Sequence, residues 1–465
     1  MSEQDEAFRD RIATVNEKGR RIWIFPKKPS GSFYNKRKIL SYFLLVLLFG
    51  GPHIRIGSEP FLLLDIIHRK FVIFGQVFWP QDMYLFAILV IVGVVFIIFF
   101  TIIFGRLFCG WVCPQTIFME LLFRRIEYWI DGDWTEQKRL EKSPWTNEKI
   151  IKRTVKHVIF WWISFFIANT FLAYIIGSDS LWHIQTDPLG KHLGGLIAII
   201  IFTYVFYGVF AFLREQVCTT ICPYGRLQGV LLDQNTMVVA YDEVRGEERA
   251  KIHKGEDRQA VGKGDCIDCG HCVHVCPTGI DIRNGTQLEC VNCTACIDAC
   301  DHMMDAVGHD KGLIRFVSEN GIKNRTPFQW TRRVKAYSIL LVGLLITLSV
   351  LLISRKSFET NILRQKGSTF QVDEHGMVSN IFEVNMLNKT NKRYNIHFEI
   401  DDSKAQIETV GKPVELKSEA KAKVLVVVKM PNDALENGMK KFKIHIFGNH
   451  QEIEVIQTKF IGPML

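Results

Sequence analysis

Eight of the twelve cysteines stand in two copies of one spacing, C-x2-C-x2-C-x3-C. This spacing predicts two [4Fe–4S] clusters, because tight loops let three thiolates of one run bind one cube while the fourth reaches the other cube. Paired C-x2-C motifs also make zinc sites, but two tandem runs of four are much rarer for zinc. The predicted ligands of one cluster are Cys266, Cys269, Cys272 and Cys300, and those of the other are Cys290, Cys293, Cys296 and Cys276.

The other four cysteines form a second repeated motif, C-x3-C-P, at the ends of two apolar stretches: Cys109 with Cys113, and Cys218 with Cys222. Cysteines four residues apart share a helix face, and the proline suits the first turn of a new helix. The positive end of that helix should lower the pKa of the second cysteine. Such thiols could bind Cu(I), hold a further iron–sulfur cluster or cycle as a dithiol; a role in close helix packing is less favoured.

Histidines and methionines lie beside the cluster cysteines: His271, His274, His302, Met303 and Met304. Both residue types bind copper. Residues around a cluster mostly tune its potential or fill space, however, and we favour that role for these five.

The composition indicates a membrane protein rather than a nucleic-acid-binding protein. The chain has 465 residues, 34 of them Phe, and its net charge of +9 comes from basic residues that flank apolar runs. Five stretches approach the roughly 20 residues that cross a hydrocarbon core. They are residues 39–57, 83–104, 155–176, 192–213 and 336–353, of which the first is the weakest because Pro52, His53 and Arg55 lie near its end.

Residues 61–78 form an apolar stretch that we do not expect to span. It contains Asp65, His68, Arg69 and Lys70. Asp, Arg and Lys each cost about 2.5–3.5 kcal/mol at a helix centre, more than the apolar residues return. We therefore predict an interfacial or partly buried loop helix there.

The loop charges predict the orientation of the chain. Residues 105–154 contain nine Lys or Arg, whereas residues 177–190 contain none. The positive-inside rule then places the N-terminus, the 105–154 loop and the cluster region in the cytoplasm, and the C-terminal region outside. The grouped cysteines indicate thiolate ligands in a reducing compartment rather than a disulfide framework.

The last hundred residues change character. Segments such as NIFEVNMLN and AKVLVVVKM alternate apolar and polar residues, which predicts an antiparallel β-sandwich. This part has no cysteine and no catalytic pattern, so we expect a scaffold or docking role.

These features predict a multi-domain membrane protein: a five-span α-helical transmembrane bundle, a cytoplasmic ferredoxin-like α+β insert and a C-terminal all-β immunoglobulin-like sandwich. The predicted parts are a basic N-terminal segment (1–38), a four-helix transmembrane region (39–232), the ferredoxin-like domain (233–335), the fifth helix (336–354) and the periplasmic domain (355–465).

The whole set of motifs resembles the FixG/CcoG (RdxA) family of cytochrome c oxidase accessory proteins. The resemblance rests on the order of five spans, two C-x3-C-P motifs, a two-cluster insert, a β-rich tail and the basic opening segment RRIWIFPKKPSGSFYNKRK. It implies a bacterial inner-membrane protein that matures cbb3-type oxidase by reducing Cu(II) to Cu(I) on the cytoplasmic side. Copper is then the substrate of a cupric reductase, handled by Cys109, Cys113, Cys218 and Cys222.

The partners expected on this reading are oxidase assembly factors, a copper-transporting P-type ATPase, an unidentified cytoplasmic electron donor, membrane lipid and a second copy of the chain, but no nucleic acid. Two other functions stay open. One is a quinol-linked electron conduit resembling the NapH-type membrane polyferredoxins, which lack the long β-tail. The other is a non-catalytic assembly scaffold.

Overall fold

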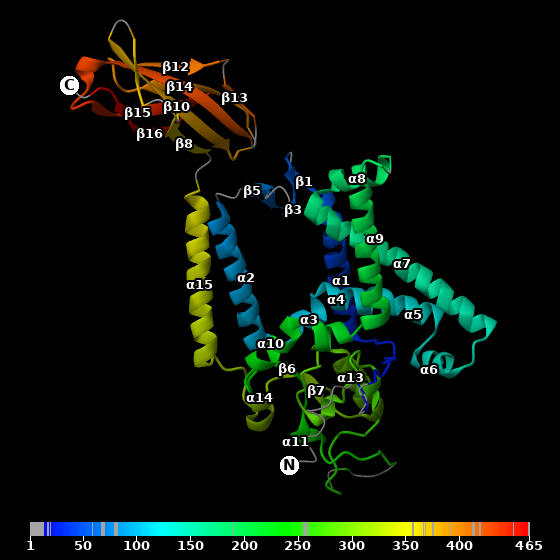
Figure 1. Cartoon of the computed structure of the whole chain (residues 1–465). Coiled ribbons are helices and arrows are strands. Elements are labelled where there is room, and N and C mark those ends of the chain that lie inside the picture. Colours follow the sequence, from blue (N-terminus) through cyan, green and yellow to red (C-terminus); the bar gives the residue numbers. More distant parts are fainter. Residues whose placement is uncertain are drawn as a thin grey trace. The chain divides into compact units, whose positions relative to one another are not determined.

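The computed structural model describes residues 14–15, 18, 20–57, 59–66, 70–78, 82–188, 190–253, 258, 260–355, 358–365, 367, 369–373, 376–390, 392–411, 414–417, 420–449 and 451–463. The chain forms two compact units. The first comprises Met1–Ile54, Pro60–Phe71 and Phe78–Leu348, and the second comprises Arg55–Glu59, Val72–Val77 and Ser349–Leu465 (Figure 1).

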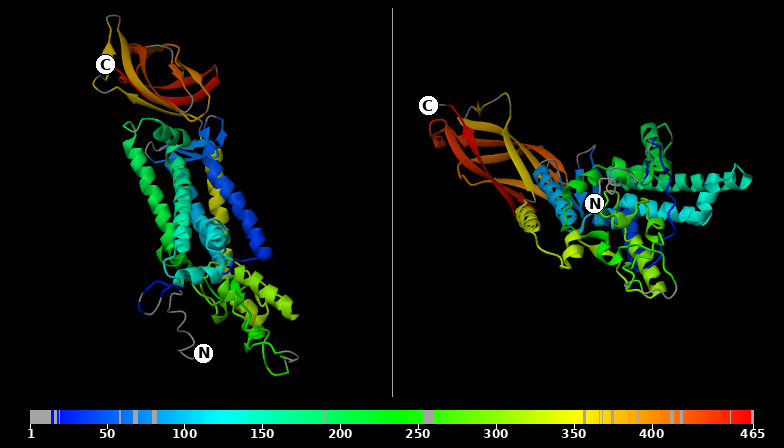
Figure 2. Two further views of the ribbon diagram at one scale, coloured as in Figure 1. Left: turned by 90° about the vertical axis from the view of Figure 1, so that its right-hand side faces the viewer. Right: turned by 90° about the horizontal axis from the view of Figure 1, so that it is seen from below.

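Four helices of the described chain are long and apolar enough to cross a membrane. They are α2 (Met83–Phe104), α7 (Asn147–Ile176), α9 (Leu193–Gly208) continued by the π-helix η5 (Val209–Leu213), and α15 (Arg332–Ile353). Only 11% to 33% of the residues in their most apolar windows are buried inside the protein, which leaves apolar side chains for a lipid environment. Helices α7 and α9 pack against each other, and so do α2 and α15 (Figures 1 and 2).

The first predicted span differs from the structure. Helix α1 runs over Ser32–Gly50, and a short 3-10 helix, η2 (Gly51–His53), follows it. Pro52 and the two preceding glycines end the helix early, so residues 39–50 supply about 18 Å of apolar helix against a core of roughly 30 Å. Helix α1 is not among the four candidate membrane helices.

The predicted loop helix over residues 61–78 is wrong. This stretch forms a three-stranded sheet of β3 (Leu62–Asp65), β4 (Lys70–Ile73) and β5 (Gln76–Phe78). Phe74 and Gly75 join β4 to β5 with φ of 51° and 73°, the left-handed pair typical of a two-residue hairpin turn. His68 and Arg69 lie outside the described residues. Strands β1 (Arg55–Ile56) and β2 (Glu59–Pro60) pair separately.

Short helices connect the long ones in the first unit. The loop after α2 contains α3 (Leu107–Trp111), α4 (Pro114–Ile117), the π-helix η4 (Phe118–Phe123), α5 (Arg124–Ile130) and α6 (Trp134–Lys142). Helix α8 (Ser178–Thr186) joins α7 to α9, and the π-helix η6 (Val217–Ile221) and α10 (Pro223–Leu231) follow η5.

The insert that carries the eight clustered cysteines is closed by an antiparallel pair of strands, β6 (Val238–Tyr241) and β7 (Ile314–Val317). Between and after them lie α11 (Glu243–Gly246), α12 (His271–His274), the 3-10 helix η7 (Ile282–Asn284), α13 (Ala295–Val307) and α14 (Glu319–Asn324). Its core contains Val239, Ile267, Ile297 and Ile314 together with six of the cysteines. The predicted α+β character of the insert is confirmed.

The second unit contains two antiparallel sheets around one apolar core. One has the order β12-β14-β10-β8, with β9 on β10, and the other the order β13-β11-β15-β16. The predicted segments NIFEVNMLN and AKVLVVVKM lie in β10 and β14, and along most of β10 the side chains alternate between buried and half-buried. The strands are β8 (Phe358–Arg364), β9 (Gln371–Val372), β10 (Met377–Asn388), β11 (Tyr394–Ile400), β12 (Gln406–Val410), β13 (Val414–Leu416), β14 (Lys421–Pro431), β15 (Met439–Gly448) and β16 (Gln451–Ile461).

Candidate functional site

The two C-x3-C-P motifs have the same local structure. Cys109 lies in α3 and Cys218 in η6, and each of these short helices ends before the second cysteine. Cys113 and Cys222 then adopt nearly equal extended conformations, with ψ of 124° and 115°, and each caps a helix that begins with proline. The predicted proline-led helices are confirmed. The prediction that each pair shares one helix face is wrong, because the chain leaves the helix between the two cysteines.

The similarity of the two repeats extends to the residue that ends each preceding membrane helix. Gly105 has φ 56° and ψ −132°, and the corresponding residue of the second repeat, Arg214, has φ 52° and ψ −122°. This conformation favours glycine, so a side chain at Arg214 is held there at a cost in backbone strain. The internal repeat seen in the sequence is therefore also a repeat of the backbone.

The four thiols of the two motifs lie close together. Burial raises the pKa of Cys218 to about 12, and the thiols of Cys113 and Cys109 raise it further. Cys222 has the same effect on Cys113. Cys109 Sγ donates a hydrogen bond of 3.4 Å to Gln228 Oε1 of α10, so the first motif contacts the helix that follows the second. The two motifs, more than a hundred residues apart in sequence, thus form one thiol site.

The predicted lowering of the pKa of Cys113 is wrong. Burial raises its pKa, and this outweighs the backbone N–H groups of Gln115 and Thr116 at the start of α4, which act in the opposite direction. A helix start stabilises a thiolate, but removal of water penalises the charge more strongly here. Burial therefore favours the protonated form of the Cys109, Cys113 and Cys218 thiols until a metal displaces the proton.

The cysteine runs of the insert also repeat each other. Asp268 and the corresponding Asn292 have φ of 50° and 52°. Gly270 and the corresponding Thr294 have φ of 66° and 65°, and these two residues stand directly before the helices that carry the third cysteine of each run. These left-handed residues turn the chain tightly between cysteines. The two runs therefore present their thiols in the same way.

The eight thiols fall into two groups by proximity. Burial raises the pKa of Cys300 to about 12, with further increases from Cys266 and Cys269, and Cys272 responds to Cys300 and Cys269. The second group is Cys276, Cys290, Cys293 and Cys296. Burial is the main cause of the raised pKa of Cys296, and the other three thiols of this group raise it further. The structure brings together the same two sets of four that the crossed ligand pattern requires, while ligation itself stays a prediction.

The thiol groups fit iron–sulfur cubes. Five cysteines of the insert line one apolar pocket together with Val239, Ile280 and Ile282, as expected for a bulky, poorly hydrated group. Four thiolates without any other charged donor are the usual ligands of a [4Fe–4S] cluster.

The thiol site adjoins the second cysteine group directly. Cys109 packs in one buried cluster with Val291 and Cys293. A Cβ atom on Gly110 would lie 2.4 Å from the carbonyl oxygen of Val291, so α3 approaches the insert as closely as a glycine permits. Arg106 donates hydrogen bonds to the carbonyl oxygens of Leu288 and Cys218, which ties the insert to both motifs.

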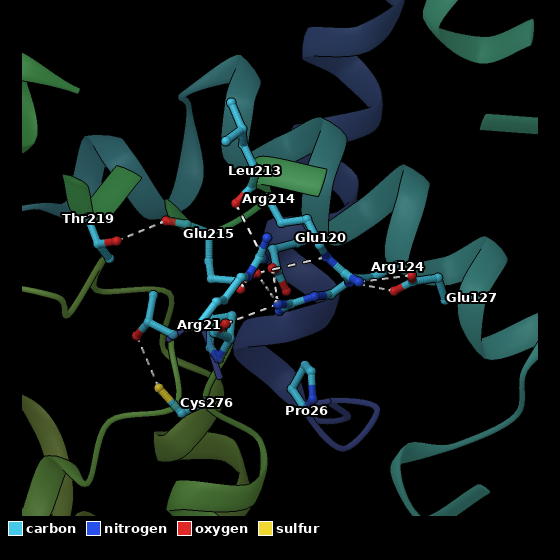
Figure 3. Close-up of polar contacts among 12 residues, drawn as sticks. Arg21, Pro26, Glu120, Arg124, Glu127, Leu213, Arg214, Glu215, Thr219 and Cys276 are labelled. Carbon is cyan, nitrogen blue, oxygen red and sulfur yellow. Dashed lines mark hydrogen bonds and ion pairs between the residues drawn. The ribbon is translucent and has the colours of Figure 1, made fainter. Parts of the chain in front are cut away.

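A network of buried charges lies at the start of the second C-x3-C-P motif (Figure 3). Arg124 forms ion pairs with Glu120 (2.6 Å) and Glu215 (3.4 Å) and donates to the carbonyl oxygen of Pro277 (3.0 Å), next to Cys276. Arg214 donates to both carboxylate oxygens of Glu127, at 3.1 and 2.6 Å. This network connects α5, the second motif and the insert through side chains that water does not reach.

Sequence reasoning missed this network, because it counted Arg124 only among the basic residues of a loop. Two signals were available. Glu120 and Arg124 are spaced i,i+4 beside an apolar run, and an acid, Glu215, directly follows Arg214 ahead of the second motif.

Comparisons with known proteins assign the chain to a family. Residues 213–319 match the 4Fe-4S dicluster domain, residues 86–135 match a 4Fe-4S binding domain, and residues 348–463 match the domain described as an IG-like fold at the C-terminus of FixG. Protein RdxA of Cereibacter sphaeroides is 34% identical over 394 residues, which cover 82% of each chain. The chain belongs to the FixG/RdxA family.

Nitrogen fixation protein FixG of Rhizobium meliloti is 32% identical over 428 residues, covering 83% of this chain and 80% of the relative. Ferredoxin-type protein NapH of Escherichia coli is 24% identical over 211 residues, covering 42% of this chain and 59% of NapH. The chain is thus an iron–sulfur electron-transfer protein related to FixG and RdxA. Cys109 and Cys113 fall inside the second 4Fe-4S match, so a further cluster stays open as the role of the C-x3-C-P thiols.

The N-terminal segment of this FixG/RdxA-family chain is not a free basic tail over its described part. Lys27 N–H donates to the carbonyl oxygen of His274 (2.7 Å), and Arg21 pairs with Glu215 (2.8 Å). Asp298 of α13 accepts hydrogen bonds from the backbone N–H groups of Phe33 and Tyr34 at the start of α1. The segment therefore joins the insert to the buried charge network.

The histidines and methionines considered as alternative copper ligands lie in the insert, where the ring centroids of His271 and His274 are 6.3 Å apart. His274 stacks on Trp134 with ring centroids 4.6 Å apart, and Met304 is buried in the apolar core. Within the part of the chain that the structure describes, no metal-binding group includes His271 or His302. Their arrangement supports the packing and tuning role favoured from the sequence.

Proposed function

We propose that this protein reduces Cu(II) to Cu(I) at its four C-x3-C-P thiols and supplies the reduced ion for assembly of a cbb3-type haem–copper oxidase. The observation that carries the proposal is that Cys109 and the predicted cluster ligand Cys293 belong to one buried apolar cluster, which brings the soft thiol site to the cysteine group of the insert. Each Cu(II) takes up one electron and leaves as Cu(I). The [4Fe–4S] clusters, when bound, supply one-electron transfer.

The residues of the thiol site suit the product of this reaction. Thiolate and thioether donors prefer Cu(I) to Cu(II), and Cys218 shares its pocket with the thioether of Met119. Met119 and Val291 give this pocket apolar surface, which suits the softer, less hydrated ion. Protons held by the buried thiols are released when copper binds, since only thiolates are ligands.

The topology that we propose has five spans, with the N-terminus and the thiol site in the cytoplasm and the C-terminal domain in the periplasm of a bacterial inner membrane. It is supported by the contrast of nine basic residues in 105–154 and none in 177–190. A reporter fused after residue 465 should then read periplasmic. A cytoplasmic signal there would mean that α1, whose apolar part is short, does not span.

Replacement of the cysteines tests the reaction. Purified anaerobically, the Cys109→Ala/Cys113→Ala and Cys218→Ala/Cys222→Ala variants should lose Cu(II) reduction and keep about eight iron atoms, as the two-cube pattern requires. Thr220→Ala, an exposed change between the two cysteines of the second motif, is the matched control. If the quadruple variant reduces Cu(II) at the parent rate, copper meets electrons at the insert and the proposal is wrong.

Two measurements separate this function from its competitors. About twelve iron atoms in the parent protein, falling to about eight in the quadruple variant, would assign a third cluster to the C-x3-C-P thiols. The similarity to NapH favours a quinol-linked conduit as the second candidate. Rapid reduction of the protein by a quinol, without any reduction of Cu(II), would support that candidate. Inactivity toward both quinol and Cu(II) would support the non-catalytic assembly scaffold.

A further inference from the structure

Arg37 of α1 is a buried cation without a counter-charge among the described residues. Its side chain is only 2% exposed, and neither Nε nor Nη2 has a hydrogen-bond partner in the described part of the chain. A guanidinium stays charged inside proteins, and a buried charge that lacks an anion is strongly unfavourable. Its burial therefore indicates that an anionic group belongs beside it.

The contact between α1 and α13 fixes where Arg37 lies. Asp298 of α13 caps α1 by accepting the N–H groups of Phe33 (3.0 Å) and Tyr34 (2.7 Å). Phe33 packs against the core of the insert. Arg37 follows Phe33 by four residues and so lies on the same face of α1, one turn farther along. The helix that it faces, α13, carries two of the cluster cysteines.

The guanidinium of Arg37 acts on Cys293. Arg37 lies close enough to Cys293 for its charge to act on this thiol. Glu120 also acts on this thiol, but its carboxylate is paired with Arg124 at 2.6 Å. The buried thiol group of the insert is therefore the site that Arg37 faces.

We propose that Arg37 is the counter-ion of the [4Fe–4S] cluster predicted at Cys276, Cys290, Cys293 and Cys296, and that it raises the reduction potential of this cluster. A cube bound by four thiolates has a net negative charge that grows on reduction, so a fixed buried cation favours the reduced form. Arg37 is a positioning and tuning residue in this role, since it contacts no substrate.

The cations near the other cysteine group are engaged. Arg283 is paired with Asp281 (2.7 Å) and Asp268 (2.6 Å). Arg258 is also buried, and it donates hydrogen bonds to the carbonyl oxygens of Gly264 (2.6 Å) and Cys266 (2.9 Å). Arg37 is not among the largest charges acting on Cys272 or Cys300, so its removal should leave that cluster unchanged.

An anaerobic redox titration followed by EPR, on the full-length protein in detergent, tests this proposal. In Arg37→Gln, the equilibrium constant for reducing the cluster of the Cys293 group should fall at least tenfold, which is 59 mV for a one-electron couple, while the other cluster is unchanged. Arg37→Lys should shift it by less than threefold. Lys36→Gln removes the exposed cation next to Arg37 and should change neither cluster.

Iron and sulfide content decides between tuning and simple packing. If Arg37→Gln keeps both cubes and both potentials, the proposal is overturned. If Arg37→Gln loses one cube, Arg37→Lys becomes the deciding variant: retention of that cube supports a counter-ion, and its loss overturns the proposal in favour of a packing role. The titration contains no copper, so failure of the proposed cupric reduction would leave its result unaffected.

Discussion

Gly105 and Arg214 adopt the same left-handed backbone conformation, each four residues ahead of the first cysteine of its repeat. At Gly105 the conformation is accessible without strain. At Arg214 the side chain is held in place by its bidentate contact with Glu127. The second repeat thus has a strained backbone at Arg214, a buried cation, whereas the first repeat has a glycine at the corresponding position.

Comparison of two substitutions should separate the strain from the ion pair. Arg214→Ala loses the buried pair with Glu127 and should destabilise the protein by about 3–5 kcal/mol. Arg214→Gly loses the same pair but relieves the backbone, so it should be about 1 kcal/mol more stable than Arg214→Ala. Thermal unfolding in detergent measures both. Equal stability of the two variants would show that the backbone at this residue carries no strain.

The closeness of α3 to the insert predicts an effect of one methyl group. In Gly110→Ala, the added Cβ would meet the backbone of Val291 and Asn292, which cannot rotate away. We expect Cu(II) reduction to fall by at least tenfold while iron content is kept, because the two parts are pushed apart. Gly93→Ala in α2 adds a methyl group with no atom within 4 Å and should be neutral. A fully active Gly110→Ala variant would contradict the proposed closeness.

Arg124 should be essential for keeping the loop at Cys276 in place. Arg124→Met leaves Glu120 buried without its partner and removes one of the partners of Glu215, which should cost about 3–5 kcal/mol. It also removes the donor to the Pro277 carbonyl group, so iron should be lost first from the cluster that includes Cys276. Iron content after mild heating measures this. The neighbouring exposed residue provides the control: Arg125→Gln should retain iron like the parent.

The cap that Asp298 provides can be tested in the same way. Asp298→Ala removes both acceptors at the start of α1, and such caps contribute about 0.5–2 kcal/mol. Asp298→Asn keeps one acceptor oxygen and should retain about half of the effect. Asp305→Ala, on an exposed position of the same helix, should change little. Equal melting temperatures for all three variants would rule out a stabilising cap.

The sequence predicted the elements whose signals are local. The 22 residues Met83–Phe104 contain no charge, so the bounds of α2 agree with the prediction. Along β14 more buried side chains alternate with less buried ones, and this strand was also expected. Residues 61–78 were misassigned because only charge and hydropathy were considered, while the turn at Phe74 and Gly75 was overlooked.

The candidate site was predictable in its residue types but not in its environment. Cysteine spacing grouped the thiols, whereas the rise in the pKa of Cys113 depends on burial by segments distant in sequence. Arg106 and Arg214 form structural contacts, to Leu288 and to Glu127, that no local pattern encodes. The sequence did not distinguish Arg37 as a buried residue, because it stands between two other basic residues.

The cap on α1 also has a consequence for the order of folding. The first helix of the chain is completed by Asp298, a residue that leaves the ribosome long after α1 has been made. Because metal binding and folding of such a domain are linked, α13 reaches its final form only when the iron–sulfur clusters are in place. In a chain made without enough iron, the start of α1 should therefore stay uncapped. Membrane proteases would be expected to cleave the chain there.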